Sequence, residues 1–170
     1  LITGLLEKIL DRSVEIDEAV YKSEKETGHR NRALAWFLKD INSLEGDVEE
    51  VLDLYFRQCS ILVDCADLAR IGMFLATKGI TEAGIPLISA QSVRLATTFM
   101  VTCGMYNASG EFAIQVGIPA KSGVSGGILG VVPGRYGVAT FGPALDKKGN
   151  SVVGIRMLRH LSQVLELSIF

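Results

Sequence analysis

The spacing of apolar residues changes near residue 105, and this change is the strongest constraint on the fold. Before it, apolar residues recur three and four positions apart, as in "DVEEVLDLYFRQC" and "LVDCADLARIGMFLATKGI", which is typical of amphipathic helices. After it, residues 111–145 are rich in Val, Ile and Gly and are interrupted by prolines. We therefore expect residues 1–105 to be mostly helical, and residues 106–170 to hold antiparallel strands and a closing helix.

Helix ends can be placed from capping residues. Asp47, with Glu50 three residues later, predicts a capping box at the start of "DVEEVLDLYFRQC". Gly79 is a predicted stop for the next helix. We expect "SAQSVRLATTFMVTCGMY" to form a helix that ends near Gly104, and "RALAWFLKDI" to form a shorter one.

Three strands are expected, at about residues 112–117, 126–132 and 136–142. "PGRYG" predicts a turn that joins the last two strands in antiparallel fashion, and "DKKGN" predicts a turn before the helical stretch "SVVGIRMLRHLSQVLEL". This order describes an α+β class, and a length of 170 residues favours one domain. The sheet looks incomplete, so we expect further strands from a segment N-terminal to this chain.

Composition excludes several function classes. A net charge of −2 gives no basic face for a nucleic-acid partner, and no apolar run approaches the roughly 18 residues of a membrane span. The three cysteines, Cys59, Cys65 and Cys103, have no paired spacing, which favours neither disulfides nor zinc and suits a cytoplasmic location. We expect the cysteines to be buried and inert, and His29 and His160 to lie on the surface.

The stretch "GIPAKSGVSGG" carries the first candidate for chemistry. It is not a phosphate loop, because Ala120 precedes Lys121 where that motif needs glycine, and no helix is expected to follow. "AKSGV" instead matches the Lys-Ser/Thr-Gly strand of serine-type acyl enzymes. There the lysine supplies positive charge and the hydroxyl, here that of Ser122, binds a substrate carboxylate. The alternative is an ordinary glycine-rich edge strand with an exposed lysine.

Three long stretches together resemble the serine-dependent glutaminase family: "VYKSEKETGHRNRALAWFL", "LYFRQCSILVDCADLARIG" and "GIPAKSGVSGGILGVVPGRYGVATFGPALDKKGNSVVG". The resemblance covers about residues 15–155, in the family's order and spacing. It implies a β-lactamase/transpeptidase-like fold and hydrolysis of L-glutamine to L-glutamate and ammonia through an acyl-serine intermediate. It also implies that neither a metal nor an organic cofactor takes part. We further expect a homo-oligomer.

The resemblance assigns roles to individual residues. Glu24 and Asn31 are expected to bind the α-amino and α-carboxylate end of glutamine, and Tyr55 to line the same pocket. Tyr106 is expected to assist proton transfer beside the nucleophile, and the Val124 backbone N–H to serve the oxyanion hole. The chemistry suits these residues, because an ammonium needs a buried acceptor and an oxyanion donor is worth about 3 kcal/mol.

The same residues have plainer interpretations. Glu24 lies in the charged run "YKSEKE", which is typical of a solvated helix face. Tyr55 is typical of the core side of an amphipathic helix. Tyr106 suits a loop anchor, and Asn31 suits the N-cap of "RALAWFL".

None of the twelve serines has a lysine three residues later, so the Ser-x-x-Lys nucleophile of such enzymes is absent from these residues. We therefore expect residues 1–170 to be the C-terminal part of a single glutaminase catalytic domain, with the nucleophile outside this chain. One alternative is a non-catalytic glutamine-binding or interaction module. Another is a β-lactamase-like amide hydrolase, which Glu24 argues against because a β-lactam offers no α-ammonium.

Overall fold

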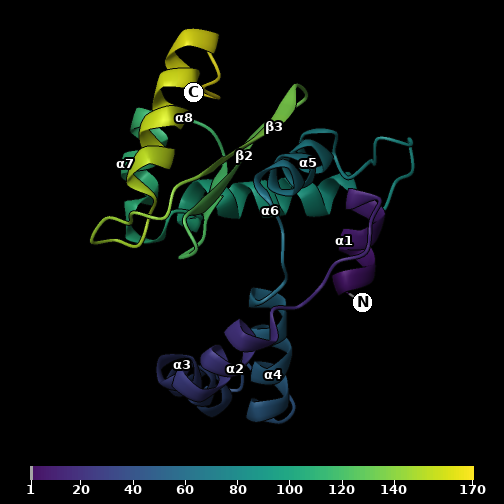
Figure 1. The fold of residues 1–170 in the computed structure, drawn as a ribbon, viewed down its shortest axis with the longest axis vertical. Helices are drawn as coiled ribbons and strands as arrows, with labels where there is room; N and C mark the ends of the chain where they lie inside the picture. The colour runs from purple at the N-terminus through teal and green to yellow at the C-terminus, as the bar shows by residue number, and fades with distance from the viewer. Residues whose placement is uncertain (1) are drawn as a thin grey trace. The chain divides into compact units, whose positions relative to one another are not determined.

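Two compact units make up the computed structural model, which describes residues 2–170. The helical unit comprises residues 2–7 and 12–63, and the sheet unit comprises residues 8–11 and 64–170 (Figure 1). Helix α1 (Ile2–Leu10) therefore contributes to both. That residues 1–170 form one domain stays a prediction, and Leu1 lies outside the described residues.

The helical unit is built from α2 (Glu18–Thr27), α3 (His29–Asp40) and α4 (Val48–Cys59). Its core consists of Tyr21, Ala35, Val48, Leu52 and Phe56. The segments that enter and leave the unit pair with each other, since the Leu62 N–H donates to the Glu15 carbonyl at 2.8 Å. Helix α3 confirms the expected shorter helix but begins three residues earlier than its predicted start.

Capping at α4 agrees with the sequence only in part. The Asp47 carboxylate accepts hydrogen bonds from the N–H groups of Glu49 and Glu50, which confirms Asp47 as N-cap. The structure gives α4 no returning bond from the Glu50 side chain, so the predicted box is half formed. A complete capping box lies at the next helix, α5 (Cys65–Ala76), where Asp64 and Asp67 bond each other's N–H groups.

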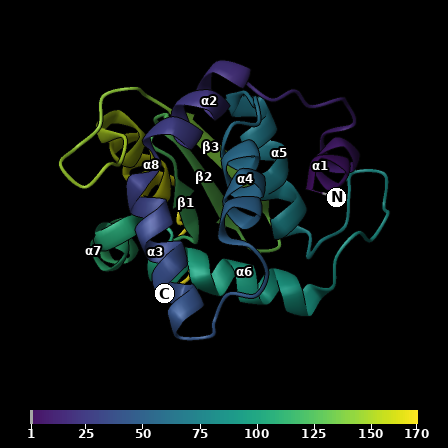
Figure 2. The same ribbon diagram turned by 90° about the horizontal axis from the view of Figure 1, so that it is seen from below.

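The sheet unit has three layers. Strands β1 (Ala120–Ser122), β2 (Gly127–Val132) and β3 (Tyr136–Phe141) form an antiparallel sheet in the order β1-β2-β3. Figure 2 shows α5 on one side of the strands and α8 (Val152–Leu165) on the other. Side chains of β2 alternate between them: Ile128 packs with Leu158 of α8, and Leu129 packs with Leu68 of α5.

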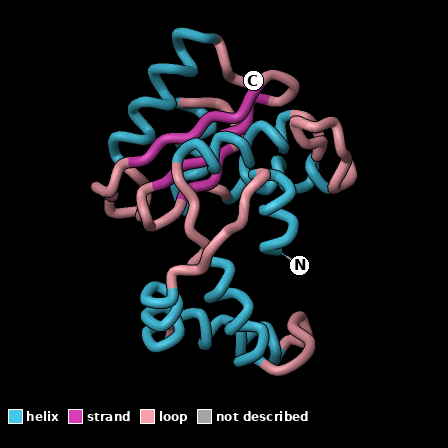
Figure 3. Tube along the Cα trace, turned by 45° about the vertical axis from the view of Figure 1, so that its right-hand side comes forward, coloured by secondary structure: helices cyan, strands magenta, loops and turns pink. Residues whose placement is uncertain are grey.

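The predicted hairpin and closing helix are confirmed. β2 pairs with β3 from Gly127–Phe141 to Val132–Tyr136, so "PGRYG" turns the chain as expected (Figure 3). Helix α6 (Ala90–Cys103) ends at the predicted Gly104. The α+β order of elements is therefore as predicted.

The strand predicted at residues 112–117 is wrong. A short 3₁₀ turn, η1 (Tyr106–Ala108), leads into helix α7 (Ser109–Gln115). Phe112 and Val116 are both buried, four residues apart on one helical face, whereas Ile114 between them is 88% exposed. A strand would have put all three on one side of the sheet. The first strand is instead β1, which contains the Lys-Ser pair of "AKSGV".

In residues 2–170, none of the helices has the length and hydropathy needed to span a bilayer.

Candidate functional site

The structure divides the six predicted site residues equally between the two units. Glu24 lies on α2, Asn31 on α3 and Tyr55 on α4 of the helical unit. In the sheet unit, Tyr106 opens η1, Ser122 ends β1, and Val124 lies in the turn that follows. The geometry of each group is described within its own unit.

A glycine separates the helices that carry Glu24 and Asn31. Gly28 follows α2 and caps α3, so the helix is broken in "TGH". A Cβ at Gly28 would lie 2.6 Å from the Phe56 ring and 2.7 Å from the Glu24 carbonyl, which requires glycine at this approach. Asn31 lies inside the first turn of α3, so its interpretation as an N-cap is wrong.

The Glu24 and Asn31 side chains make no polar contacts within the described residues. Both are half-buried. Within residues 2–170, neither the Glu24 carboxylate nor the Asn31 amide has a hydrogen-bond or ion-pair partner. A half-buried carboxylate without a cation is a ready acceptor for an ammonium group, whereas a fully solvated one is not. The half-buried position of Glu24 is compatible with binding of an ammonium group, and its role in binding stays a prediction.

Tyr55 is not a core residue, which corrects that alternative. Its side chain is exposed, and its ring meets that of Phe56 edge-on, with centroids 6.0 Å apart. Phe56 is fully buried, so the neighbouring Tyr55 faces outward from α4.

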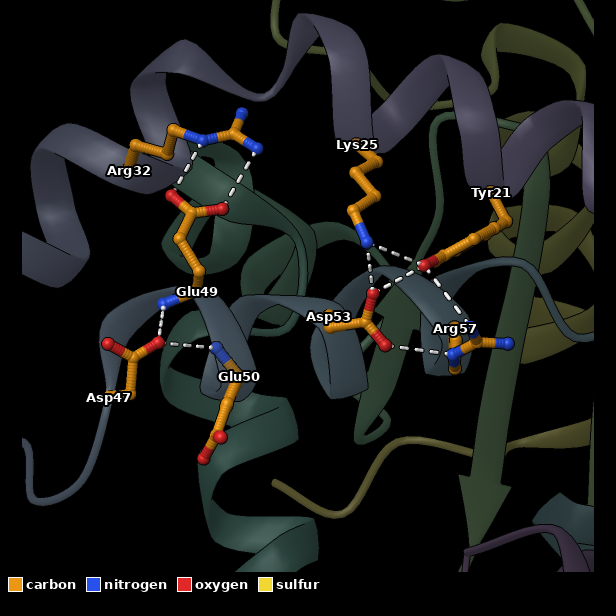
Figure 4. A network of polar contacts seen from close by, with 8 residues as sticks. All are labelled: Tyr21, Lys25, Arg32, Asp47, Glu49, Glu50, Asp53 and Arg57. Carbon is orange, nitrogen blue, oxygen red and sulfur yellow. Dashed lines mark hydrogen bonds and ion pairs between the residues drawn. The ribbon is translucent and has the colours of Figure 1, made fainter.

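A charged cluster joins α2 to α4 beside these residues (Figure 4). Lys25 donates to Asp53 at 2.6 Å and to the Tyr21 hydroxyl at 3.0 Å, and the Tyr21 hydroxyl donates to the same carboxylate. Arg57 donates to the other carboxylate oxygen at 2.9 Å, and its guanidinium lies 4.4 Å from the Tyr21 ring centroid. The cluster fixes the helix of Glu24 against the helix of Tyr55.

The contacts within this cluster shift the pKa values of its charged groups. Hydrogen bonds from Lys25, Tyr21 and Arg57 hold the pKa of the Asp53 carboxyl well below its usual range. Asp53 in turn raises the pKa of Lys25 and that of Arg57. Asp53 therefore stays negative at any ordinary pH. The Lys25 ammonium forms its ion pair with Asp53 and not with the adjacent Glu24.

A second ion pair joins α3 to α4. The Arg32 guanidinium binds the Glu49 carboxylate in a two-pronged arrangement, with distances of 2.9 and 3.2 Å (Figure 4). Bidentate arginine–carboxylate pairs fix orientation as well as distance. Arg32 follows Asn31 directly, so this pair sets the rotation of the helix that carries Asn31.

In the sheet unit, β1 is tied to the end of α6. The Ser122 N–H donates to the Gly104 carbonyl at 3.1 Å. A Cβ at Gly104 would lie 1.9 Å from the Ala120 carbonyl oxygen, so only glycine permits this approach. The tie brings the Lys-Ser pair beside the turn that carries Tyr106.

Lys121 and Ser122 point to opposite sides of β1, as neighbours on a strand do. The Ser122 side chain is 2% exposed, and its hydroxyl lies 3.5 Å from the Gly104 carbonyl. Lys121 is exposed, and its ammonium donates to the Ser122 backbone carbonyl and lies 4.7 Å from the centroid of the Tyr106 ring. The Lys121 ammonium thus lies close to the ring of the predicted proton-transfer group, on the other side of β1 from the Ser122 side chain.

Val124 lies in the tight turn that follows β1. The turn is closed by hydrogen bonds from Gly123 to Gly127 at 2.9 Å and from Gly126 to Gly123 at 3.0 Å. The Val124 side chain is 69% exposed, and its N–H donates to no group within residues 2–170. An oxyanion site uses backbone N–H groups that have no other acceptor, so the turn is compatible with the role predicted for Val124, which stays a prediction.

The remaining expectations divide. His29 and His160 are exposed, as predicted. The cysteines are all exposed, so the expectation that Cys59, Cys65 and Cys103 are buried is wrong. They lie near helix ends, at positions that turn away from the core. Among the described residues, no group of three or more metal-binding side chains occurs.

Comparison with known proteins identifies the family. The glutaminase family model matches residues 1–170. A glutaminase from Alkaliphilus oremlandii is 58% identical over 171 residues, which cover 100% of this chain and 54% of that protein. A glutaminase from Clostridioides difficile is 60% identical over 159 residues, covering 93% of this chain and 52% of that protein. The chain thus spans about half the length of these relatives.

Solved structures agree. A probable Bacillus subtilis glutaminase complexed with 6-diazo-5-oxo-L-norleucine superposes with a TM-score of 0.96 at 45% identity, over 99% of this chain and 58% of that one. A covalent complex of a Bacillus subtilis glutaminase with 5-oxo-L-norleucine gives a TM-score of 0.95 at 45% identity, over 99% of this chain and 61% of that one. These matches confirm the β-lactamase-like fold over the part that the chain spans. Sequence, fold and family model agree over the whole chain, which therefore belongs to the glutaminase family.

Proposed function

We propose that the protein carrying this chain is a glutaminase, which hydrolyses L-glutamine to L-glutamate and ammonia. The main support is the close superposition on a glutaminase in covalent complex with 5-oxo-L-norleucine. That compound has the α-ammonium and α-carboxylate of glutamine, and a ketone in place of the side-chain amide. A pocket built for it is built for glutamine.

The proposed reaction proceeds through an acyl-serine. A serine from a Ser-x-x-Lys motif outside this chain gives its hydroxyl proton to the lysine of that motif, its oxygen bonds the amide carbon, and the carbonyl electrons move onto oxygen. The Val124 N–H stabilises that oxyanion. Tyr106 passes a proton to the nitrogen, the C–N bond breaks, and ammonia leaves. Water then attacks the ester and releases glutamate, which restores the serine.

The helical unit supplies the groups for the amino-acid end of the substrate. Glu24 binds the α-ammonium, and Asn31 donates its amide to the α-carboxylate. Tyr55 presents an outward ring to the same pocket. The partner-free state of Glu24 and Asn31 among the described residues supports both assignments. In the sheet unit, the Ser122 hydroxyl, which lies 3.5 Å from the Gly104 carbonyl, is proposed as a further substrate contact.

One observation favours a second function, that of a glutamine-binding or interaction module without turnover. No Ser-x-x-Lys occurs in the 170 residues, although the other site groups are present. The two functions differ in one sequence feature. A Ser-x-x-Lys in the rest of the parent protein favours the enzyme, and its absence there favours the module.

The protein is further proposed to be a cytoplasmic homo-oligomer. Its cysteines are exposed thiols, which suits a reducing compartment. Helix α3 carries an exposed apolar stripe, formed by Leu34, Phe37, Leu38 and Ile41 at helical spacing. The stripe faces away from the α4 side that Arg32 and Ala35 contact. A second copy packed antiparallel on this stripe buries both faces at once. Phe37→Asp is expected to lower the mass measured by light scattering.

Ammonia release by the full-length protein tests the main proposal. We expect turnover of L-glutamine and, because one methylene displaces the carbonyl from its donors, about 100-fold slower turnover of L-asparagine. The 170-residue chain alone is expected to give no turnover, since it lacks the activated serine. Equal kcat/KM for both amides contradicts a pocket fitted to glutamine. Turnover by the chain alone that Ser122→Ala abolishes contradicts the placement of the nucleophile.

A further inference from the structure

The backbone of Tyr106 has an unusual conformation. Its φ is 52°, in the left-handed region that bulky side chains rarely adopt. Such a conformation persists only where the surroundings hold it, and it is concentrated at functional sites. The contacts around Tyr106 therefore show what fixes the direction of its side chain.

Ser109 makes two bonds to this turn. Its hydroxyl oxygen accepts a hydrogen bond from the Met105 N–H at 3.0 Å and donates its proton to the Tyr106 carbonyl at 2.8 Å. Ser109 and Met105 are both buried, so water does not replace these bonds. One side chain thus holds backbone groups on both sides of the Met105–Tyr106 peptide.

Asn150 makes the third bond from a distant part of the chain. It is 0% exposed, and its side-chain N–H donates to the Met105 carbonyl at 3.3 Å. Asn150 is fixed in turn by Asp146, whose carboxylate accepts from the Asn150 N–H at 3.0 Å. The Asn150 side-chain oxygen has no partner within residues 2–170, although it is buried. Burial of a side-chain oxygen without a hydrogen bond is unfavourable, which suggests that the bond from Asn150 to the Met105 carbonyl has a role.

We infer that Ser109 and Asn150 are positioning residues, which hold the turn at Met105 and Tyr106 so that the Tyr106 side chain lies beside Lys121. The inference rests on the proposed proton-transfer role of Tyr106. The two residues reach the turn from separate elements, α7 and the loop before α8, and neither contacts the Tyr106 hydroxyl. They act on the reaction only through the placement of that ring.

The test is a double-mutant cycle on glutamine hydrolysis by the full-length protein. Ser109→Ala and Asn150→Ala are each expected to lower kcat by about 10- to 100-fold with little change in KM, because small misplacements of a reacting group cost about that much. Combined with Tyr106→Phe, either change is expected to lower kcat no further, since the hydroxyl that it positions is already absent.

Ser162→Ala is the matched control. Ser162 is also buried in the sheet unit and donates to a backbone carbonyl, that of Val116, but it does not touch the turn. Its loss is expected to lower thermal stability about as much as Ser109→Ala and to leave kcat unchanged. An equal fall of kcat in the control, or a full additional fall in the Tyr106→Phe background, overturns the positioning role.

The outcomes separate the two proposals. Near-normal kcat for Tyr106→Phe overturns the proton-transfer role itself. A large loss for Tyr106→Phe with normal kcat for Ser109→Ala and Asn150→Ala keeps that role and overturns only the positioning inference. If Asn150→Ala does not fold, a crystal structure of Ser109→Ala decides the matter, because an unchanged Tyr106 conformation there contradicts the inference.

Discussion

The two units hold their site residues by different physical means. In the helical unit, half-exposed ion pairs fix the helices that carry Glu24 and Asn31: Asp53 joins α2 to α4, and Arg32 joins α3 to α4. In the sheet unit, buried hydrogen bonds and a close backbone approach fix Tyr106 and Ser122. Each way of holding the residues suits the role that is proposed for its unit.

The difference has a chemical reason. The ion pairs of the helical unit are partly exposed, so each orients its helices for only a small gain in free energy, because water competes for the charges. Proton transfer and oxyanion stabilisation need atoms placed within a fraction of an ångström, which buried neutral bonds provide without sensitivity to salt or pH. Changes in the sheet unit are therefore expected to alter kcat, and changes in the helical unit to alter substrate capture.

The largest expected effect lies in the sheet unit. Tyr106→Phe in the full-length protein is expected to lower kcat by about 10²- to 10⁴-fold and to leave KM nearly unchanged, because only a proton-transfer group is lost. Steady-state kinetics with L-glutamine measure both constants. Tyr136→Phe on β3 serves as the control and should remain active. A rise in KM without a fall in kcat would assign Tyr106 to binding and remove the contrast between the units.

Glu24→Gln tests the proposed role of the helical unit in substrate capture. Loss of the charge that meets the α-ammonium is expected to cost about 2–5 kcal/mol in kcat/KM, which corresponds to roughly 30-fold or more. The neighbouring Glu26→Gln, on the exposed side of α2, should have little effect. Lower thermal stability together with normal kcat/KM would make Glu24 a structural residue.

Gly104→Ala tests the close approach in the sheet unit. The added Cβ meets the Ala120 carbonyl at 1.9 Å and the Met100 carbonyl at 2.4 Å, so the backbone must shift. We expect a loss of about 1–3 kcal/mol of unfolding free energy, seen as faster amide exchange in β1 and β2. Gly110→Ala, where nothing lies within 4 Å, is the control. Equal exchange in both variants would mean that the approach is not tight.

The smallest expected effect is a pH dependence confined to the helical unit. The pKa of Asp53 is depressed in the folded state, so its contribution to stability is present above about pH 4, the ordinary value for aspartate, and is lost as pH falls toward the folded pKa. Trp36, the one tryptophan, lies on α3 and reports this unit by its fluorescence. Denaturant unfolding at pH 7 and pH 3 measures the loss.

Asp53→Asn is expected to remove that part of the pH dependence, because no carboxyl remains to titrate. Asp40→Asn, a change at an exposed position on α3, should leave the pH dependence as it is. The same dependence in wild type and Asp53→Asn would show that the cluster does not stabilise the unit.

Several features could be predicted because they depend on residues close together in the chain. The change of apolar spacing near residue 105 separated the helices from the strands. "PGRYG" placed the β2–β3 hairpin, and Asp47 placed the start of α4. The candidate site residues came from resemblance to a family rather than from local pattern, since Glu24 looks like any other charge in "YKSEKE".

Local pattern was misleading where tertiary contacts choose between two conformations. "EFAIQV" alternates like a strand, yet burial of Phe112 and Val116 against Met105 and Leu158 selects the helix α7. The three cysteines were expected in the core because they are apolar, but each lies on a solvent-exposed face at the end of its helix.

The sequence by itself determined most of the helices and the β2–β3 hairpin, because hydrophobic spacing, caps and turn residues act over a few positions. Only the tertiary structure decided which polar groups are satisfied and which remain open. Lys25 pairs with Asp53, 28 residues away, whereas Glu24 has no hydrogen-bond or ion-pair partner among the described residues. Asn150 reaches Met105 across 45 residues. Such pairings depend on packing between distant segments, which no local spacing encodes.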